Sequence, residues 1–448
     1  MKNYKNMFKL ILICFISLVV FSACGDASET SDSASPSKSD GDVLVVYYVK
    51  DHLFYQTALE EYQKKEQVSL ELHAFETEEE LAKQYTAEGL AGGGADVLLL
   101  SDTSSLDAEK LMTEGICFDL TEYLEQDQNY NKEDYFEIVV DAGKQEGKQY
   151  ILPITFDMGF AVARNTVSEL CGNILTDDTD CYEFYQKLLA CQQLLYDSEE
   201  IRLGLCFTSD STEDFLLYAY HTSGLELTDG KTVSVNSEQL RQLCDFVKAG
   251  QEEFQAKYDE MKNSGSNSAT LVGYQLLYGN PAAIIRQQEY AYEAMFQENI
   301  NYFMFPEDTA GGYRATVRDF GLVDAKSDCP EEAYKLLKYL IDYDFYNLGV
   351  VYTAGTPVNR NIFESQFHNL STITKVTMGK NAMPVSPMAE DLAAKIEKQI
   401  NKISSAGLKH PDMEQIFAET MADYVNGTAD FDTCYQLMCS RLNLYLKE

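Results

Sequence analysis

The chain has 448 residues, of which 72 are Asp or Glu and 35 are Lys or Arg, so its formal net charge is −37. This acidity argues against a nucleic-acid partner, because binding to phosphates depends on Lys and Arg. A hydrophobic content of 45% predicts a folded protein, and the length predicts two lobes, because one hydrophobic core rarely serves so many residues.

The first 23 residues have the pattern of a bacterial export signal. Three lysines precede an apolar run over 10–21, which is shorter than the roughly 20 residues that span a bilayer. The run ends in Phe21-Ser22-Ala23-Cys24, which resembles a lipobox and implies that Cys24 becomes the acylated mature N-terminus. Phe21 departs from the usual Leu, and an uncleaved anchor is the alternative.

Residues 24–42 follow as a predicted tether. From Gly25 to Asp42 they read GDASETSDSASPSKSDGD, without a large apolar side chain. Such a segment cannot bury enough surface to offset the entropy of ordering, so we expect a flexible spacer between the membrane and the folded body.

The body begins with three predicted strands that alternate with three predicted helices. The strands are 43–49, 68–75 and 95–100, and the first is a near-continuous apolar run, as in a parallel strand covered on both faces. The helices are 54–65, 78–90 and 107–114. This order predicts a parallel, doubly wound α/β sheet. Glycines 92–94 follow a helix instead of preceding one, so they are predicted to end it and not to bind phosphate.

Neither the cysteines nor any motif indicates catalysis. Once Cys14 and Cys24 are set aside, nine of the 11 cysteines are left, scattered without CxxC spacing, which favours buried thiols over disulfides or a zinc site. The sequence has five histidines and no nucleophile elbow, His-Glu-x-x-His pair, P-loop or kinase motif. We therefore expect no enzymatic activity, no cofactor and no metal.

Several segments, taken in order, resemble one family. They include the segment LAKQYTAEGLAGGGADVLLLSD, the segment LMTEGICFDLTEYL, the crossover QYILPITFDMGFAVARNTV, GNPAAII before an expected strand, and the turn AGTPVN. Together they resemble the extracellular solute-binding proteins of the sugar-binding type, which are the ligand-capturing lipoproteins of ABC importers.

The resemblance implies a two-lobed, hinge-linked periplasmic-binding-protein-like fold of type II, with the ligand cleft between the lobes. Its implied first lobe is 43–154 plus 319–350, and its second is 155–318 plus 351–448. It implies a monomer that is lipid-anchored on the extracellular face of the cell membrane and delivers a small-molecule solute, a carbohydrate, to ABC permease subunits. The open alternatives are a non-sugar ligand such as a peptide, polyamine or polyol, and a surface sensor or adhesion protein.

Candidate ligand-binding residues follow from the cleft and crossovers that the resemblance implies, together with the rule that ligands of open α/β sheets bind beyond the carboxyl ends of strands. They are Tyr47, Tyr48, Asp51, Asp102, Phe156, Asp157, Tyr220, Arg286, Arg318 and Tyr352. Tyr220 is included because it lies near a helix end that often approaches the ligand in the family. Because the chain has no Trp, Tyr and Phe rings are expected to stack on a sugar. Alternatives remain: both Tyr47 and Tyr48 in the core, Asp102 as a helix cap, and Arg318 in a salt bridge across the hinge. Arg286 is expected to follow a strand, AAII.

Overall fold

The computed structural model describes residues 43–447 except 51, 53–54, 92–93, 177–178, 197–202, 208–210, 265–271, 308–311, 346–354 and 379–380. The predicted export signal, Cys24 and the tether lie outside the described residues, as do Asp51 and Tyr352. Within the described residues, no helix is long and apolar enough to cross a membrane.

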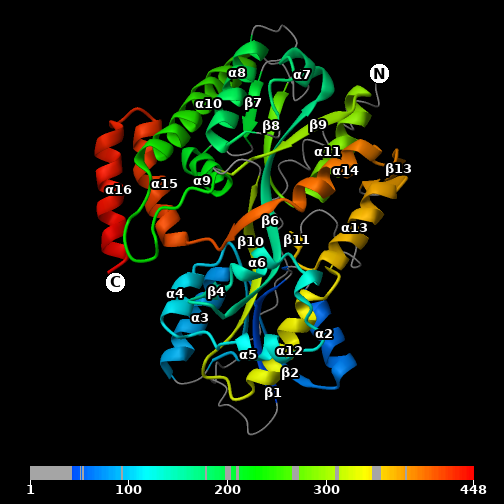
Figure 1. Ribbon diagram of the computed structural model, residues 1–448, viewed down its shortest axis with the longest axis vertical. Coiled ribbons are helices and arrows are strands. Elements are labelled where there is room, and N and C mark those ends of the chain that lie inside the picture. The colour runs from blue at the N-terminus through cyan, green and yellow to red at the C-terminus, as the bar shows by residue number, and fades with distance from the viewer. Residues whose placement is uncertain are drawn as a thin grey trace, which may run out of the picture. The chain divides into compact units, whose positions relative to one another are not determined.

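A ten-stranded sheet runs through the described body (Figure 1), and seven of its strands follow the order β2-β1-β3-β10-β6-β8-β7. Strand β11 also pairs with β6, β14 with β10, and β9 with β6. The ten strands are β1 (Val43–Val49), β2 (Ser69–Phe75), β3 (Val97–Ser101), β6 (Ile151–Arg164), β7 (Leu203–Phe207), β8 (Val272–Gly279), β9 (Ile300–Met304), β10 (Tyr313–Val323), β11 (Thr356–Pro357) and β14 (Ile403–Gly407).

The first part of the body confirms the predicted strand–helix alternation. Strand β1 has the predicted bounds, and β2 and β3 lie within two residues of theirs. Both pair with β1 in parallel. The helices between and after them are α2 (Tyr55–Glu66), α3 (Glu78–Ala91) and α4 (Ala108–Thr113). Helix α3 ends at Ala91, directly before glycines 92–94, which agrees with the prediction that these glycines end the helix.

Strands β6 and β10 connect the two parallel parts of the sheet. The first half of β6 pairs with β10, and its second half pairs with β8 and β9. Strand β10 runs antiparallel to both β3 and β6. The sheet is therefore parallel at β2-β1-β3 and at β8-β7. Between them the long strands β6 and β10 pair antiparallel with each other, and β14 adds a parallel pair at β10.

The buried side chains form two hydrophobic clusters. The first gathers around β1, β3 and the start of β6, and the second around α8 (Cys181–Tyr196), α9 (Thr212–Ser223) and α15 (Pro411–Val425). Apolar residues of α11 (Pro281–Phe296) and α14 (Glu390–Ile400) pack in the first cluster, although their residues fall in the predicted second lobe. The lobe boundaries remain a prediction.

The other elements complete the covering layers and loops. They are α5 (Thr121–Gln126), the 3-10 helix η1 (Lys132–Asp134), α6 (Glu137–Asp141), β4 (Lys144–Gln145), β5 (Lys148–Gln149), α7 (Asn165–Leu170), α10 (Ser237–Ser264), α12 (Pro330–Ile341), α13 (Arg360–Thr372), β12 (Lys375–Met378), β13 (Asn381–Pro384) and α16 (Phe431–Tyr445). Eight of the described cysteines are free thiols, and six of those are buried.

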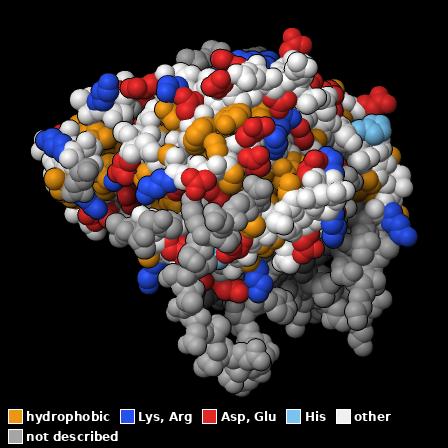
Figure 2. Space-filling view, turned by 90° about the horizontal axis from the view of Figure 1, so that it is seen from below, with side chains coloured by type: hydrophobic (Ala, Val, Ile, Leu, Met, Phe, Trp, Pro, Cys, Tyr) orange, Lys and Arg blue, Asp and Glu red, His pale blue; other side chains and the backbone are white. Residues whose placement is uncertain are grey.

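The surface seen in Figure 2 carries acidic and basic side chains that are interspersed with apolar ones. No continuous basic field covers this face, although nucleic-acid binding depends on such a field.

Candidate functional site

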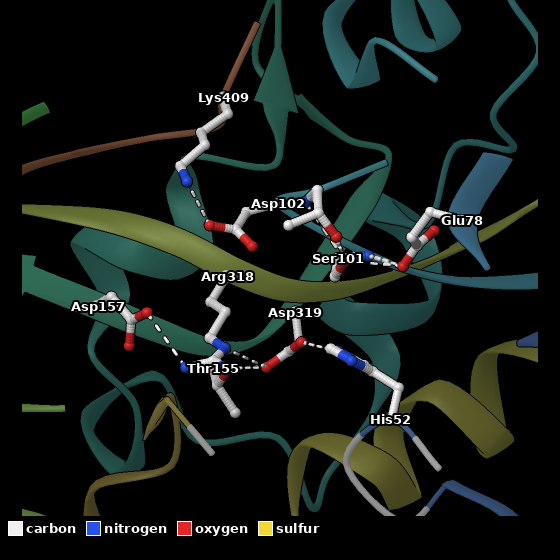
Figure 3. A network of polar contacts seen from close by, with 10 residues as sticks. His52, Glu78, Ser101, Asp102, Thr155, Asp157, Arg318, Asp319 and Lys409 are labelled. Carbon is white, nitrogen blue, oxygen red and sulfur yellow. Dashed lines mark hydrogen bonds and ion pairs between the residues drawn. The ribbon is translucent and has the colours of Figure 1, made fainter. Parts of the chain in front are cut away.

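Four charged side chains meet where β3, β10 and β6 lie side by side (Figure 3). Asp102 follows the carboxyl end of β3, Asp157 lies in β6, and Arg318 and Asp319 lie in β10. Asp319 is opposite Ser101 in one pairing and Thr155 in the other. Because β3 and β10 are neighbours in the sheet, Asp102, which follows β3, lies near Asp319 in β10, although the two residues are 217 positions apart in the sequence.

The Asp102 carboxylate lies 2.5 Å from the Lys409 ammonium group. Lys409 follows β14, so this ion pair links the end of β3 to the segment that leads into α15. Asp102 does not cap the next helix. That cap is Asp107, whose side chain accepts hydrogen bonds from the backbone N–H groups of Glu109 and Lys110. Of the two interpretations of Asp102, the capping alternative is therefore wrong.

Asp157 is buried in β6 and is only partly satisfied. One carboxylate oxygen lies 3.3 Å from an Arg318 nitrogen, and the other, Oδ1, has no hydrogen-bond partner among the described residues. Burial, followed by the nearby charges of Asp102 and Asp319, raises the pKa of Asp157 to about 6 in spite of Arg318. Arg318 thus forms a salt bridge between β10 and β6, and the hinge that this salt bridge was expected to cross remains a prediction.

Asp319 is fully buried and has three partners. His52 lies 2.5 Å from one of its oxygens. The Thr155 hydroxyl donates a hydrogen bond to the other oxygen, which also lies 3.8 Å from Arg318 Nε. Burial alone would raise the pKa of Asp319, but the charges of His52 and Arg318 and the Thr155 hydrogen bond hold it below its usual value. Asp319 also raises the pKa of His52, although burial opposes this, so the pair favours its charged form.

A pocket of about 880 Å³ opens beside this cluster and includes Asp102 and Lys409 in its wall. Its lining comes from the end of β3, the strand β8 and the helices α9 and α15. The buried apolar residues of the lining, Tyr218, Leu276 and Ala418, belong to the second hydrophobic cluster, and Leu277 packs against the first. The lining residues are Asp102, Thr103, Ser104, Glu213, Asp214, Leu217, Tyr218, His221, Leu276, Leu277, Tyr278, Lys409, Pro411, Glu414, Gln415, Ala418 and Glu419.

This wall combines aromatic surface with hydrogen-bond acceptors. The Tyr278 ring lies 6.2 Å from the Tyr218 ring and 6.1 Å from the His221 ring. His221 in turn lies 3.2 Å from Glu414. Apolar surface with a few fixed polar groups is typical of small-molecule sites, and aromatic rings beside carboxylates suit the apolar faces and hydroxyl groups of a sugar. In the described part of the chain, no group of three His, Cys, Asp or Glu side chains could hold a metal ion.

Three predicted ligand-binding residues lie in the hydrophobic core. Tyr47, Tyr48 and Phe156 are each at most 2% exposed. The Tyr47 ring packs on His73 and Phe75, its hydroxyl donates to Glu88, and Phe156 packs on Phe136. None of the three lines the 880 Å³ pocket, which agrees with the core alternative for the tyrosines.

The prediction for Arg286 is wrong in its secondary structure. The AAII segment belongs to helix α11, in which Asn280 is the N-cap and Pro281 follows at the first helical position. Arg286 is completely buried, pairs with Glu289, and donates to the backbone oxygens of Leu370, Ile373 and Ser386. Its donors therefore hold neighbouring segments together and do not face the pocket.

Tyr220 lies outside the main pocket, on the wall of a second one of about 350 Å³. Its ring packs on Phe417 and His221. The neighbouring residues Lys409 and His410, which come shortly after β14, line different pockets. Lys409 lines the 880 Å³ pocket, and His410 lines the second one. Asp102, Asp157 and Arg318 are thus the predicted site residues that the structure brings together.

The sequence missed Lys409, Glu414 and Tyr278 as site residues. Lys409 and Glu414 come more than 300 residues after Asp102, and no spacing pattern joins them to it. Tyr278 is the second-last residue of β8, directly before Gly279 at the carboxyl end of the strand, which is the region that the strand-end rule selects. Applied to β8 as well, that rule would have found Tyr278.

No protein-family model matches the chain. Solved structures do match it over nearly its whole length. The sugar-binding protein MalE from Xanthomonas citri has a TM-score of 0.62 and 13% identity, over 90% of this chain and 97% of that one.

Two further solved structures agree with this match. The cyclic alpha-maltosyl-1,6-maltose binding protein from Arthrobacter globiformis has a TM-score of 0.59 and 14% identity, over 90% of this chain and 99% of that one. The GacH receptor of Streptomyces glaucescens, solved unliganded and with acarbose, has a TM-score of 0.58 and 15% identity, over 91% and 98%. The chain therefore has the mixed α/β fold of the MalE-like periplasmic solute-binding proteins.

Proposed function

We propose that the chain is the solute-binding component of an ABC importer and that it captures a sugar or oligosaccharide in the 880 Å³ pocket. The observation that carries this proposal is the pocket itself. It lies at the carboxyl end of β3, where open α/β sheets bind ligands, and its wall combines residues that follow β3 with residues of β8, α9 and α15. The structural neighbours support the same assignment through what their own names say they bind.

In this proposal Asp102 accepts hydrogen bonds from ligand hydroxyl groups, and Lys409 fixes the orientation of its carboxylate. Tyr278 and Tyr218 offer the ring surface that packs against the apolar face of a sugar. The predicted lobes would close on the solute by a hinge motion at β6 and β10, and permease subunits would recognise the closed form, which the solute favours. The protein acts as a monomer and without enzymatic chemistry.

A thermal-shift screen of the purified full chain tests this function. The panel holds neutral mono- and oligosaccharides, amino acids, short peptides and polyamines, and an extrinsic dye reports unfolding because the chain has no Trp. A ligand at 100 times its dissociation constant should stabilise the fold by about 2.7 kcal/mol. Asp102→Asn should abolish the shift. Stabilisation by peptides alone would replace the sugar by another solute, and silence across the panel would favour a sensor or adhesion protein.

We further propose that a lipid at Cys24 anchors the protein to the extracellular face of the membrane. The lipobox-like segment and the polar spacer after it support this anchor. Cys24→Ser should move the protein from the membrane fraction to the soluble fraction. Continued sedimentation of the variant with membranes would contradict a lipid anchor at this residue.

A further inference from the structure

We propose that the contacts of α4 with the start of α15 and the end of α16 form a polar latch that sets how far the 880 Å³ pocket opens. This latch rests on the proposed solute-binding function and would regulate it. It consists of Asp107, Glu109 and Lys110 on one side and of His410, Asp412 and Tyr445 on the other.

The latch lies where two walls of the pocket continue into helices. On one side, the lining residues 102–104 are soon followed by Asp107, which caps the start of α4. On the other side, His410 directly precedes the lining residue Pro411, at which α15 begins. A change in the distance between α4 and α15 would therefore move these two walls relative to each other.

The inner part of the latch is built around the buried Asp107 carboxylate. The Asp107 side chain is 4% exposed, accepts a hydrogen bond from the Tyr445 hydroxyl at 2.9 Å, and lies 3.7 Å from His410 Nδ1. The same His410 nitrogen lies 3.3 Å from Glu109. Burial would lower the pKa of His410, but Asp107, Glu109 and Glu414 raise it above its usual value. The imidazole therefore favours its charged form between these carboxylates.

Lys110 makes the outer contacts of the latch. Its ammonium group lies 4.0 Å from the Asp412 carboxylate and 3.9 Å from the centre of the Tyr445 ring. The side chain of Lys110 is 39% exposed and that of Asp412 is 56% exposed, so water can take the place of either partner when the contact breaks. Exposed ion pairs are weak for this reason, and the outer contacts can open and close at small cost.

The two sides of the latch belong to different hydrophobic clusters. Ala108, Leu111 and Met112 of α4 are buried in the first cluster, whereas the buried apolar residues of α15 and α16 lie in the second. Figure 1 shows the C-terminal end of α16 near α4. Breaking the latch would therefore leave the apolar residues of all three helices in their own clusters, which is what a contact that opens and closes requires.

Pulsed electron paramagnetic resonance measures the distance between the two sides in the full chain in detergent, without solute. Nitroxide labels are placed at Glu122→Cys in α5, whose neighbours Tyr123 and Leu124 pack against the first cluster, and at Gln436→Cys in α16. Both positions are exposed. The chain without these two changes, labelled in parallel, gives the signal of its own thiols.

Lys110→Gln combined with His410→Gln removes both cations of the latch and leaves Asp107 as the cap of α4. The pair of Asp102 and Lys409 still ties the same two walls together, so we expect a shift between open and closed molecules and not complete opening. The weight of the longer label distances relative to the shorter ones should rise about fivefold. If circular dichroism shows that the double variant is unfolded, Lys110→Gln alone should give a rise of about twofold.

Arg241→Gln is the matched control. Arg241 is 40% exposed, pairs with Asp432 at 3.0 Å, and lies 3.9 Å from the centre of the Phe431 ring, so its contacts are of the same kind as those of Lys110. They join α10 to α16, however, and the buried apolar residues of both helices lie in the second cluster. This variant should leave the label distances unchanged.

Label distances that stay the same in the latch variant and in wild type would overturn the latch, even if the variant were less stable, because the contacts would then hold the fold without setting the opening of the pocket. An equal shift in Arg241→Gln would overturn it as well, since any lost ion pair would then have the same effect. No solute takes part in this measurement. A negative result would thus leave the proposed function intact, whereas a silent thermal-shift screen would count against the proposed function alone.

Discussion

Asp157 and Asp319 are two buried aspartates on neighbouring strands, and the structure treats them in opposite ways. Asp319 has His52, Thr155 and Arg318 around it, and its pKa is held low. Asp157 shares Arg318 at 3.3 Å, keeps one oxygen without a hydrogen bond, and has its pKa raised to about 6 by burial. Both residues are buried aspartates, so the number of partners around each carboxylate decides whether its charged or its neutral form is favoured.

This contrast separates a carboxylate with a full set of partners from one that is only partly satisfied. Asp319 joins β10 to β6 through Thr155 and to the segment after β1 through His52. Its charge is used within the protein. Asp157 lies in the adjacent strand, faces fewer donors, and is held in its charged form at a cost to stability.

Asp319→Asn should give the largest loss of stability. It leaves His52 and Arg318 without the carboxylate between them, and breaking a buried ion pair costs about 3–5 kcal/mol. Urea unfolding of the variant and the wild type at pH 7.5 measures the difference. Asp432→Asn is the matched control, since its side chain is 79% exposed and surface pairs contribute about 0–1 kcal/mol. A loss of similar size in both variants would erase the contrast between the two aspartates.

Asp157→Asn should increase the stability of the fold at neutral pH, in contrast to Asp319→Asn. The pKa of Asp157 is raised to about 6 in the folded state, so the folded protein binds its proton more tightly than the unfolded chain. Stability therefore falls as pH rises from about 4 to about 6, by at most about 3 kcal/mol. Removal of the charge should raise stability at pH 7.5 by about 1–3 kcal/mol, because Arg318 keeps Asp319 as a partner.

Unfolding measured between pH 4 and 7.5 checks this sign. The difference between Asp157→Asn and wild type should become small at pH 4, where the wild-type carboxyl is protonated in the folded state and about half protonated in the unfolded chain. A variant that is less stable than wild type at pH 7.5 would mean that the Arg318 ion pair outweighs the cost of burial.

Tyr445→Phe should have the smallest effect of the three. Its hydroxyl donates to Asp107 at 2.9 Å, which links the end of α16 to the cap of α4. Asp107 also accepts two backbone N–H groups and lies 3.7 Å from His410, so the loss should be about 1 kcal/mol. Chemical denaturation resolves this change, and a loss above 3 kcal/mol would show that Asp107 depends on Tyr445 as Asp319 depends on its partners.

Local sequence patterns predicted the first elements of the fold well. Strand β1 was predicted with its observed bounds, because an apolar run between polar residues has few alternatives. The AAII segment was misassigned to a strand, because four apolar residues do not reveal their period. The Asn-Pro pair before it caps a helix and was the stronger signal.

The sequence predicted those residues of the candidate site that lie in or directly after the expected strands. Asp102, Asp157 and Arg318 lie in or after strands that cross the sheet, and all three reach the charged cluster. Tyr47 and Tyr48 satisfy the same rule but turn into the core, since aromatic side chains gain more from burial. Lys409 and Glu414 come from a distant segment, and only the folded chain places them at the pocket.

The most direct test of the contrast is a ¹³C NMR titration of the aspartate side-chain carboxyl groups in the full chain, with Asp157→Asn for assignment. The account predicts one carboxyl that titrates near pH 6 and is absent from the Asp157→Asn spectrum. A spectrum with no titration near pH 6, or one in which that titration survives in the variant, would contradict the account.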